Sequence, residues 1–228
     1  GAVASVLALH GINDRKIVYK LSKYVHYKSQ GNLGSGFDIS AACFGSHFFM
    51  SERDDMSDFL NYMDEDHNIL KEEFFWPQNL IPLIIFTGTS ASTVKLIERV
   101  NEFKERKPGQ YEKFILEYNN VNIECKKAFE LNNSEAIKKY LEMSWELRRT
   151  LGEMARANIE DSKTTRLLDN LRSNGAFTAG LLGAGGGDSI LVLCLNKHEK
   201  ENITEMAENT GLAVFENAKI VNQGYDIK

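Results

Sequence analysis

Residues 183–188 consist of four glycines and one alanine followed by an aspartate, and they lie between two apolar segments. Residues with almost no side chain adopt positive φ values, so several backbone N–H groups can turn toward one anion, such as a phosphate. The alternative is a tight turn between two strands, although two glycines are enough for such a turn. The candidate residues on the phosphate side of a nucleotide site are Gly183, Ala184, Gly185, Gly186, Gly187 and Asp188.

This glycine run matches neither of two familiar nucleotide motifs. In a dinucleotide-binding Gly-x-Gly-x-x-Gly motif the third glycine would fall at Asp188, and the motif needs a helix where this sequence continues as an apolar strand. A Walker loop needs Lys-Ser or Lys-Thr after its last glycine, where this chain has Asp188 and Ser189. The sequence context excludes both motifs and leaves a small-residue loop between strands.

A second segment, Gly-Ser-Gly-Phe-Asp-Ile-Ser at residues 34–40, places an acid directly after a glycine-rich loop. The carboxylate of Asp38 could orient or deprotonate an acceptor group, with Ser35 and Gly36 contacting the same substrate. The alternative is that Asp38 caps the N-terminus of a short helix, which is a common position for aspartate.

A third segment, residues 87–95, places several hydroxyl side chains and one lysine at the start of a helix. The N-terminus of a helix attracts anions because its first N–H groups are unpaired and its dipole is positive there. Helix capping by a single hydroxyl is the alternative. The candidate substrate-binding residues of this segment are Ser90, Ser92, Thr93 and Lys95.

The composition is that of an ordinary globular protein, with 43% hydrophobic residues, 26% charged residues and a formal net charge of -5. This balance argues against a nucleic-acid partner, and no apolar run approaches the ~18 residues of a membrane span. The cysteines Cys43, Cys125 and Cys194 are odd in number and widely spaced, which predicts buried reduced thiols in a cytoplasmic protein.

Hydrophobic periodicity and turn residues predict the elements that position these segments. Helices are expected at 2–10, after Asn13 or Asp14, at 39–44, around 56–63, from about 89 to the Pro108-Gly109 stop, at 111–131, after Asn133 or Ser134, at 161–173 and at 197–211; strands are expected at 47–50, 80–88, on both sides of the glycine run and once or twice within 212–224. This order is not the strict alternation of a parallel βαβ sheet, so it predicts an α+β fold.

Taken together and in this order, the segments at 34–46, 87–97 and 180–193 resemble the GHMP small-molecule kinases. The Gly-Ala-Gly-Gly-Gly-Asp run is similar to that family's third motif, and the Gly-Ser-Gly-Phe-Asp segment is similar to the loop that carries its acidic active-site residue, here Asp38. The likeness covers nearly the whole chain and is greatest to the members that phosphorylate phosphomevalonate. One departure is Gly180, where relatives often carry a lysine.

The resemblance implies an S5-like N-terminal domain and a ferredoxin-like C-terminal domain, with ATP and acceptor bound between them. We expect residues 1–80 to be the remainder of the first domain and residues 81–228 to be the second. The family's first motif and its Gly-Leu-Gly-Ser-Ser phosphate loop are absent from this sequence, and Gly1 to Ala4 resemble the start of the helix that follows that loop. We therefore expect that an N-terminal portion is missing and that this polypeptide alone is inactive.

The resemblance further implies phosphoryl transfer from ATP, with Mg²⁺, to phosphomevalonate, giving diphosphomevalonate for isoprenoid synthesis. Asp38 would be the catalytic residue, and the metal ligands and oligomeric state stay unassigned. The alternatives are a mevalonate kinase, a diphosphomevalonate decarboxylase, and a non-catalytic kinase-like binding module.

Overall fold

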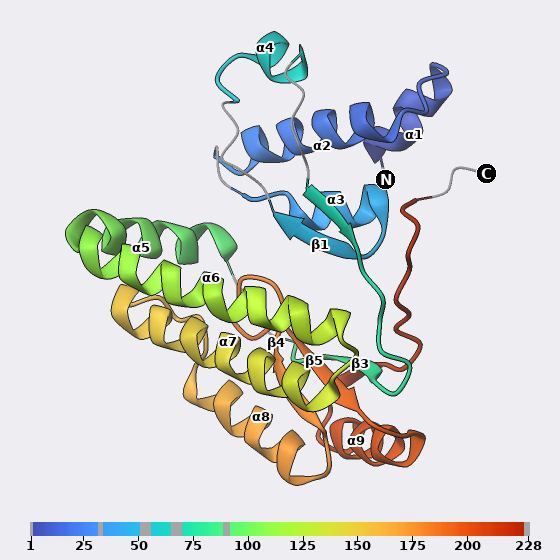
Figure 1. The fold of residues 1–228 in the computed structure, drawn as a ribbon, viewed down its shortest axis with the longest axis vertical. Coiled ribbons are helices and arrows are strands. Elements are labelled where there is room, and N and C mark those ends of the chain that lie inside the picture. The colour runs from blue at the N-terminus through green and yellow to red at the C-terminus, as the bar shows by residue number, and fades with distance from the viewer. Residues whose placement is uncertain (1, 32–33, 51–55, 65–69, 89–91, 226–228) are drawn as a thin grey trace. The chain divides into compact units, whose positions relative to one another are not determined.

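The computed structural model describes residues 2–31, 34–50, 56–64, 70–88 and 92–225, and Figure 1 shows their helices and strands. The chain forms two compact units, Gly1–Phe74 with Ile220–Lys228, and Phe75–Lys219. The compact units divide after Phe74, whereas the expected domain boundary lies between residues 80 and 81, and residues 220–225 pack with the first unit.

The first unit is mostly helical. Its elements are α1 (Ala2–Leu9), α2 (Arg15–Ser29), α3 (Phe37–Phe44), β1 (His47–Met50), α4 (Phe59–Asp64) and β2 (Leu70–Glu73). Asp14 caps α2 as expected, because its carboxylate accepts hydrogen bonds from the N–H groups of Lys16 and Ile17. Strand β2 pairs antiparallel with β1 and was not predicted, because Leu-Lys-Glu-Glu has no β signal of its own.

Residues 220–225 return to this unit and run beside the end of α3. Ser46 donates a backbone hydrogen bond to Val221 at 2.7 Å, and Tyr225 donates one to Ala42 at 2.8 Å. The two backbones approach closely because Gly45 and Gly224 carry no Cβ; a Cβ at Gly224 would lie 2.0 Å from the carbonyl oxygen of Cys43. Among the described residues, 212–224 contain one strand, so the option of a second closing strand is wrong.

The second unit is built on a four-stranded antiparallel sheet with the order β4-β5-β3-β6. The strands are β3 (Ile81–Phe86), β4 (Thr178–Leu181), β5 (Ser189–Cys194) and β6 (Ala213–Phe215). In chain order the unit has one strand, a group of helices, two strands, one helix and a last strand, which is the β-α-β-β-α-β pattern of ferredoxin-like folds. The expected α+β, ferredoxin-like C-terminal fold is confirmed.

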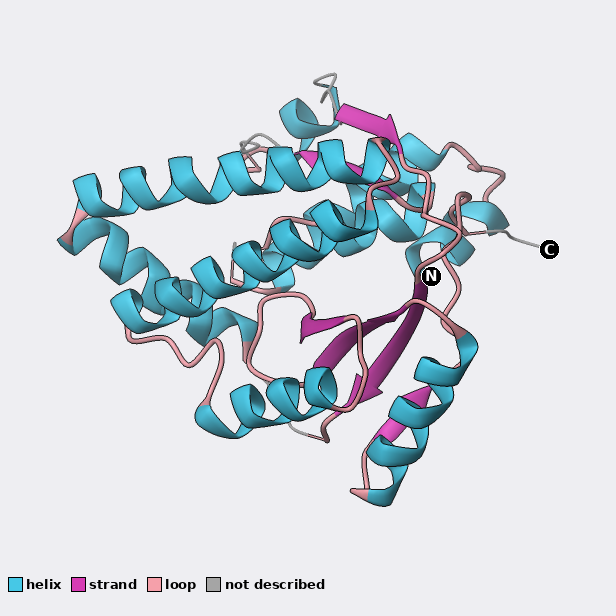
Figure 2. Cartoon of the chain, turned by 60° about the horizontal axis from the view of Figure 1, so that its bottom comes forward, coloured by secondary structure: helices cyan, strands magenta, loops and turns pink. Residues whose placement is uncertain are grey.

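Helices cover both faces of this sheet, as Figure 2 shows. One face packs against α8 (Ser162–Ser173) and α9 (Lys197–Asn209), with Ile190, Val192 and Ile203 fully buried. The other face packs against α6 (Pro108–Glu130) and α7 (Ser134–Ala155), around Leu193 and Ile137.

Local signals set the ends of these helices. Asn133 caps α7, one of the two caps that the sequence predicts, and Asp161, expected as the first residue of α8, is its N-cap. Helix α5 (Thr93–Arg106) ends before Pro108, as expected, but Pro108 is also the first residue of α6, three residues earlier than predicted. Proline suits this position because its missing N–H group would have no partner in the first turn.

Strand β4 lies at an edge of the sheet and is closely covered by helix α7. Because α7 packs against β4, the ring of Trp145 lies over Gly180, where a Cβ would lie 2.0 Å from Cδ2 of that ring. Glycine at 180 is therefore required by this packing, and a lysine there would have to displace Trp145.

The three cysteines are free and buried, which confirms the expected state of these side chains. Burial raises the pKa of the Cys125 and Cys194 thiols to about 11, so both stay protonated near neutral pH. In the part of the chain that the structure describes, no helix is long and apolar enough to cross a membrane.

Replacing Gly180 with alanine should destabilise the protein by about 1–3 kcal/mol or more, because the added methyl group overlaps Trp145. Thermal or urea unfolding measures this loss.

Gly109→Ala is the matched control, because Gly109 lies in the first turn of α6 and a Cβ there meets nothing within 4 Å. This variant should unfold at or slightly above the wild-type midpoint. Trp145→Leu in the Gly180→Ala background should recover part of the loss; equal stability of the two glycine variants would contradict the packing argument.

Candidate active site

Asp38 lies in the first turn of α3, and its side chain is exposed. The N-cap of this helix is Gly36, which adopts φ 74° and therefore places Asp38 inside the helix. The alternative interpretation of Asp38 as the N-cap is thus wrong. None of the described residues donates a hydrogen bond to the Asp38 carboxylate, which faces solvent.

The turn that precedes Asp38 rests on a buried lysine side chain. Lys23 of α2 is 5% exposed, and its methylene groups lie 3.1–3.2 Å from where a Cβ of Gly36 would be. The Lys23 ammonium lies 5.6 Å from the centroid of the Tyr19 ring, within the range of a cation–π contact. Glycine is needed at position 36 both for its positive φ and for this close approach, whereas Ser35 is exposed.

Helix α3 is tied to β1 by a buried serine. The Ser40 hydroxyl lies 2.9 Å from Nε2 of His47, and Nδ1 of His47 lies 2.7 Å from the carbonyl oxygen of Gly45. Because a carbonyl only accepts, Nδ1 carries the proton and Nε2 accepts from Ser40. This chain of hydrogen bonds fixes α3, and therefore the position of Asp38, within the first unit.

The hydroxyl-rich segment is only partly described. Ser90 lies outside the described residues. Ser92 is the N-cap of α5, and its hydroxyl accepts a weak hydrogen bond from the Lys95 N–H group at 3.5 Å. The side chains of Thr93 and Lys95 are exposed at the same helix end. The capping interpretation holds for Ser92, and this cap uses the backbone N–H group of Lys95 and not its ammonium.

The glycine run forms the connection between β4 and β5, as expected. Four of its residues have positive φ values: Gly183 (59°), Gly185 (91°), Gly186 (85°) and Gly187 (86°). Two of its N–H groups already have partners, since Gly186 donates to the Ile159 carbonyl at 2.7 Å and Gly185 donates to Leu182 at 3.3 Å. The loop is therefore a structured turn in which only part of the backbone N–H set can face a ligand.

Three contacts from other elements hold this loop. Arg148 of α7 donates from Nη1 to the Gly183 carbonyl at 2.7 Å and from Nη2 to the Leu181 carbonyl. Ile159 packs against Gly185, where a Cβ would lie 2.6 Å from its Cγ2. Thr87, directly after β3, donates its hydroxyl to Gly187 and its N–H to the Asp188 carbonyl at 3.0 Å.

The charged groups of the loop region are Arg148 and Asp188. Burial lowers the pKa of the Arg148 guanidinium, while Tyr118 and Glu160 act in the opposite direction. Arginine nevertheless stays charged in proteins, so the two carbonyls face a cation. The Asp188 carboxylate accepts a hydrogen bond from Ser189 at 3.0 Å.

No set of metal ligands can be assigned. Within the described ranges no three His, Cys, Asp or Glu side chains gather closely enough to hold an ion. In phosphoryl transfer Mg²⁺ is held largely by the phosphates of the substrate. We therefore assign no protein ligand to Mg²⁺.

Sequence reasoning missed Arg148 and Ile159 as partners of the loop. Their roles depend on contacts between residues far apart in the chain; Arg148 lies 35 positions before Gly183. A signal for Arg148 exists in the spacing of Glu142, Trp145 and Arg148, which places all three on one side of α7.

Comparison with known proteins finds one matching family model and related kinases. Residues 125–212 match the family described as GHMP kinases C terminal. The chain is 32% identical to phosphomevalonate kinase of Saccharolobus solfataricus over 196 residues, covering 82% of this chain and 54% of that protein. It is 23% identical to mevalonate kinase of Archaeoglobus fulgidus, covering 94% of this chain and 66% of that protein.

Solved structures share the fold. The Lin0012 protein of Listeria innocua matches with a TM-score of 0.83 and 22% identity, over 93% of this chain and 62% of that one. Phosphomevalonate kinase of Streptococcus pneumoniae, in complex with phosphomevalonate and AMPPNP, matches with a TM-score of 0.72 and 17% identity, over 92% of this chain and 63% of that one.

The chain spans about half to two thirds of the length of these relatives. The similarity covers both compact units, since the structural matches include more than nine tenths of the chain. The chain has the fold of the GHMP kinases, and its residues 125–212 match the C-terminal family model of these kinases.

Proposed function

We propose that the protein containing this chain transfers the terminal phosphoryl group of ATP to phosphomevalonate, giving diphosphomevalonate and ADP. The observation that carries this proposal is the 32% identity to the Saccharolobus solfataricus phosphomevalonate kinase over 82% of the chain. The exposed Asp38 and the preformed glycine loop are the kinds of group that such a reaction needs. Three free, buried cysteines support a cytoplasmic location.

In the proposed reaction an oxygen of the acceptor phosphate attacks the γ-phosphorus of ATP while the bond to the β–γ bridging oxygen breaks. Positioning and charge neutralisation supply most of the catalysis in such transfers. The acceptor phosphate has a second pKa of about 6 and is therefore largely ionised near neutral pH. A strong base is therefore less necessary than for an alcohol acceptor, and Asp38 acts mainly by orienting the acceptor.

The other candidate residues fall into two groups. Lys95, beside the capped N-terminus of α5, would bind the phosphate or carboxylate of the acceptor, together with Thr93, Ser92 and Ser90. Ser35 and Gly36 are the substrate-binding candidates of the first unit. Residues 183–188 would lie on the phosphate side of the nucleotide. Mg²⁺ would neutralise charge on the ATP phosphates.

A coupled assay of ADP release tests the substrate. The complete protein should turn over with ATP and phosphomevalonate and show much lower activity with mevalonate or galactose. Turnover with mevalonate and not with phosphomevalonate would replace this proposal by the mevalonate kinase alternative, and no turnover with any acceptor would favour a binding module.

Replacing Asp38 with asparagine should lower kcat by at least about 10²-fold with little change in stability, because the side chain is exposed and does not cap the helix. Steady-state kinetics and thermal unfolding measure the two effects.

Asp14→Ala is the opposite control in the same unit. It removes the N-cap of α2 and should cost about 0.5–2 kcal/mol of stability while leaving kcat near the wild-type value. If Asp38→Asn keeps wild-type kcat, Asp38 has no catalytic role.

Replacing Lys95 with alanine should raise KM for the phosphorylated acceptor about tenfold or more, because one charge-assisted hydrogen bond to the anion is lost. Lys104→Ala in the last turn of the same helix is the matched control and should leave that KM unchanged. Equal KM values for the two variants would remove Lys95 from the acceptor site.

A further inference from the structure

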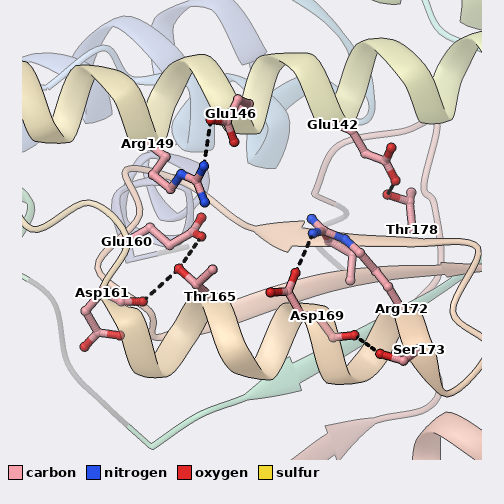
Figure 3. A network of polar contacts seen from close by, with 11 residues as sticks. Glu142, Glu146, Arg149, Glu160, Asp161, Thr165, Asp169, Arg172, Ser173 and Thr178 are labelled. Atoms are coloured by element: carbon pink, nitrogen blue, oxygen red, sulfur yellow. Dashed lines mark hydrogen bonds and ion pairs between the residues drawn. The ribbon is translucent and has the colours of Figure 1, made fainter.

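Helix α7 contacts β4 through residues spaced along one of its sides. The hydroxyl of Thr178 donates to Oε1 of Glu142 at 2.8 Å, which Figure 3 shows, and the ring of Trp145 covers Gly180. One helical step further, the guanidinium of Arg148 contacts the carbonyls of Leu181 and Gly183. Positions 142, 145 and 148 lie near one another on a helix surface, so these contacts follow β4 from its first residue into the glycine loop.

The two Arg148 contacts define a specific backbone shape. Leu181 is the last residue of β4, and Gly183, two residues further on, has a positive φ of 59°, so the guanidinium joins the end of the strand to the start of the loop. A guanidinium carries its donors in a rigid planar fork, which suits two acceptors held at a fixed spacing. A flexible lysine ammonium cannot reproduce this geometry.

The loop has a high conformational entropy when it is free, because four of its residues are glycine. A phosphate-binding loop that must be ordered on binding loses affinity, and a preformed one does not. The remaining anchors, Ile159 and Thr87, hold the middle and the end of the loop, whereas Arg148 holds its beginning.

We propose that Arg148 is a positioning residue that holds the glycine loop in its nucleotide-binding shape through its paired contacts with the carbonyls of Leu181 and Gly183. This inference rests on the proposed function, since it assigns the loop to the phosphates of ATP. Arg148 acts through the loop backbone and is not itself a catalytic residue.

A control for this role is available on the same strand. Arg172 of α8 donates from Nη2 to the carbonyl of Ala179 at 2.7 Å and from Nη1 to Asp169 at 3.3 Å, as drawn in part in Figure 3. Arg172 therefore also caps a carbonyl at the free edge of β4, but it does not contact the glycine run among the described residues. The two arginines differ in whether they reach the loop.

The first test is hydrogen exchange of the loop amides in Arg148→Met, Arg148→Lys and Arg172→Met. Exchange at residues 183–187 should be about tenfold faster or more in Arg148→Met, because two hydrogen bonds from a charged donor are lost. Arg148→Lys should give an intermediate rate, and Arg172→Met should leave loop exchange unchanged even if its melting temperature falls equally.

The second test is steady-state kinetics of the complete protein. Arg148→Met should raise KM for ATP about tenfold or more, with KM for the acceptor unchanged, and Arg148→Lys should recover part of this loss. Arg172→Met should keep the wild-type KM for ATP. If Arg148 had only a structural role, Arg148→Met and Arg172→Met would both lower stability, and Arg148→Met would not change KM for ATP selectively over KM for the acceptor.

The outcomes separate this inference from the proposed function. Wild-type loop exchange in Arg148→Met, or equal effects of Arg148→Met and Arg172→Met on the loop, would overturn the role of Arg148 even if the protein phosphorylates phosphomevalonate. Faster loop exchange in Arg148→Met, in a protein that shows no kinase activity, would retain the loop-holding role and overturn the proposed function with its assignment of the loop to ATP. If Arg148→Met does not fold, Arg148→Lys carries the same comparison.

Discussion

The shape of the glycine loop is the constraint on which the second unit's candidate site depends. A run of glycines has no preference for one conformation, so its shape must come from neighbouring elements. Here the guanidinium of Arg148, the backbone of Ile159 and the hydroxyl of Thr87 contact the loop at its beginning, middle and end. The helices and strands of this unit hold these three residues in place.

Each contact comes from an element with its own hydrophobic support. Thr87 follows β3, whose residues Leu83 and Ile85 are fully buried in the sheet core. Ile159 belongs to the cluster around Phe103, which joins α5 to the end of α7. Because these clusters are closely packed, Thr87 and Ile159 stay in place and hold the loop backbone. Loop N–H groups that are held in this way need not reorganise when charge develops on a ligand.

In the first unit, neighbouring residues likewise fix the helix that carries the Asp38 carboxylate. Asp38 is exposed, but the helix that carries it is fixed by Gly36 against Lys23 and by Ser40 against His47. A short helix of small residues has little intrinsic stability, so these contacts determine where the carboxylate lies. In each unit the candidate residues therefore have a rigid support from neighbouring elements.

The sequence predicted those features that depend on local chemistry. The caps at Asp14 and Asn133, and the glycine turn between two strands, follow from residue type and spacing within a few positions.

Features that depend on distant partners were not predicted. Strand β2 is formed by its pairing with β1, and the path of residues 220–225 depends on two glycines in different parts of the chain. The role of Arg148 became visible only when β4 and α7 were seen to lie together. The family resemblance predicted which kind of site the chain contains, and the contacts that hold its loop are seen only in the structure.

The most direct test of the central claim is an NMR titration of the complete, ¹⁵N-labelled protein with Mg²⁺ and a non-hydrolysable ATP analogue. We predict that the amide resonances of Gly183 and Ala184 shift on saturation, while that of Gly186, which already donates to Ile159, shifts least. If the analogue binds and the loop amides do not shift, the glycine run is a structural turn and not a phosphate-binding loop.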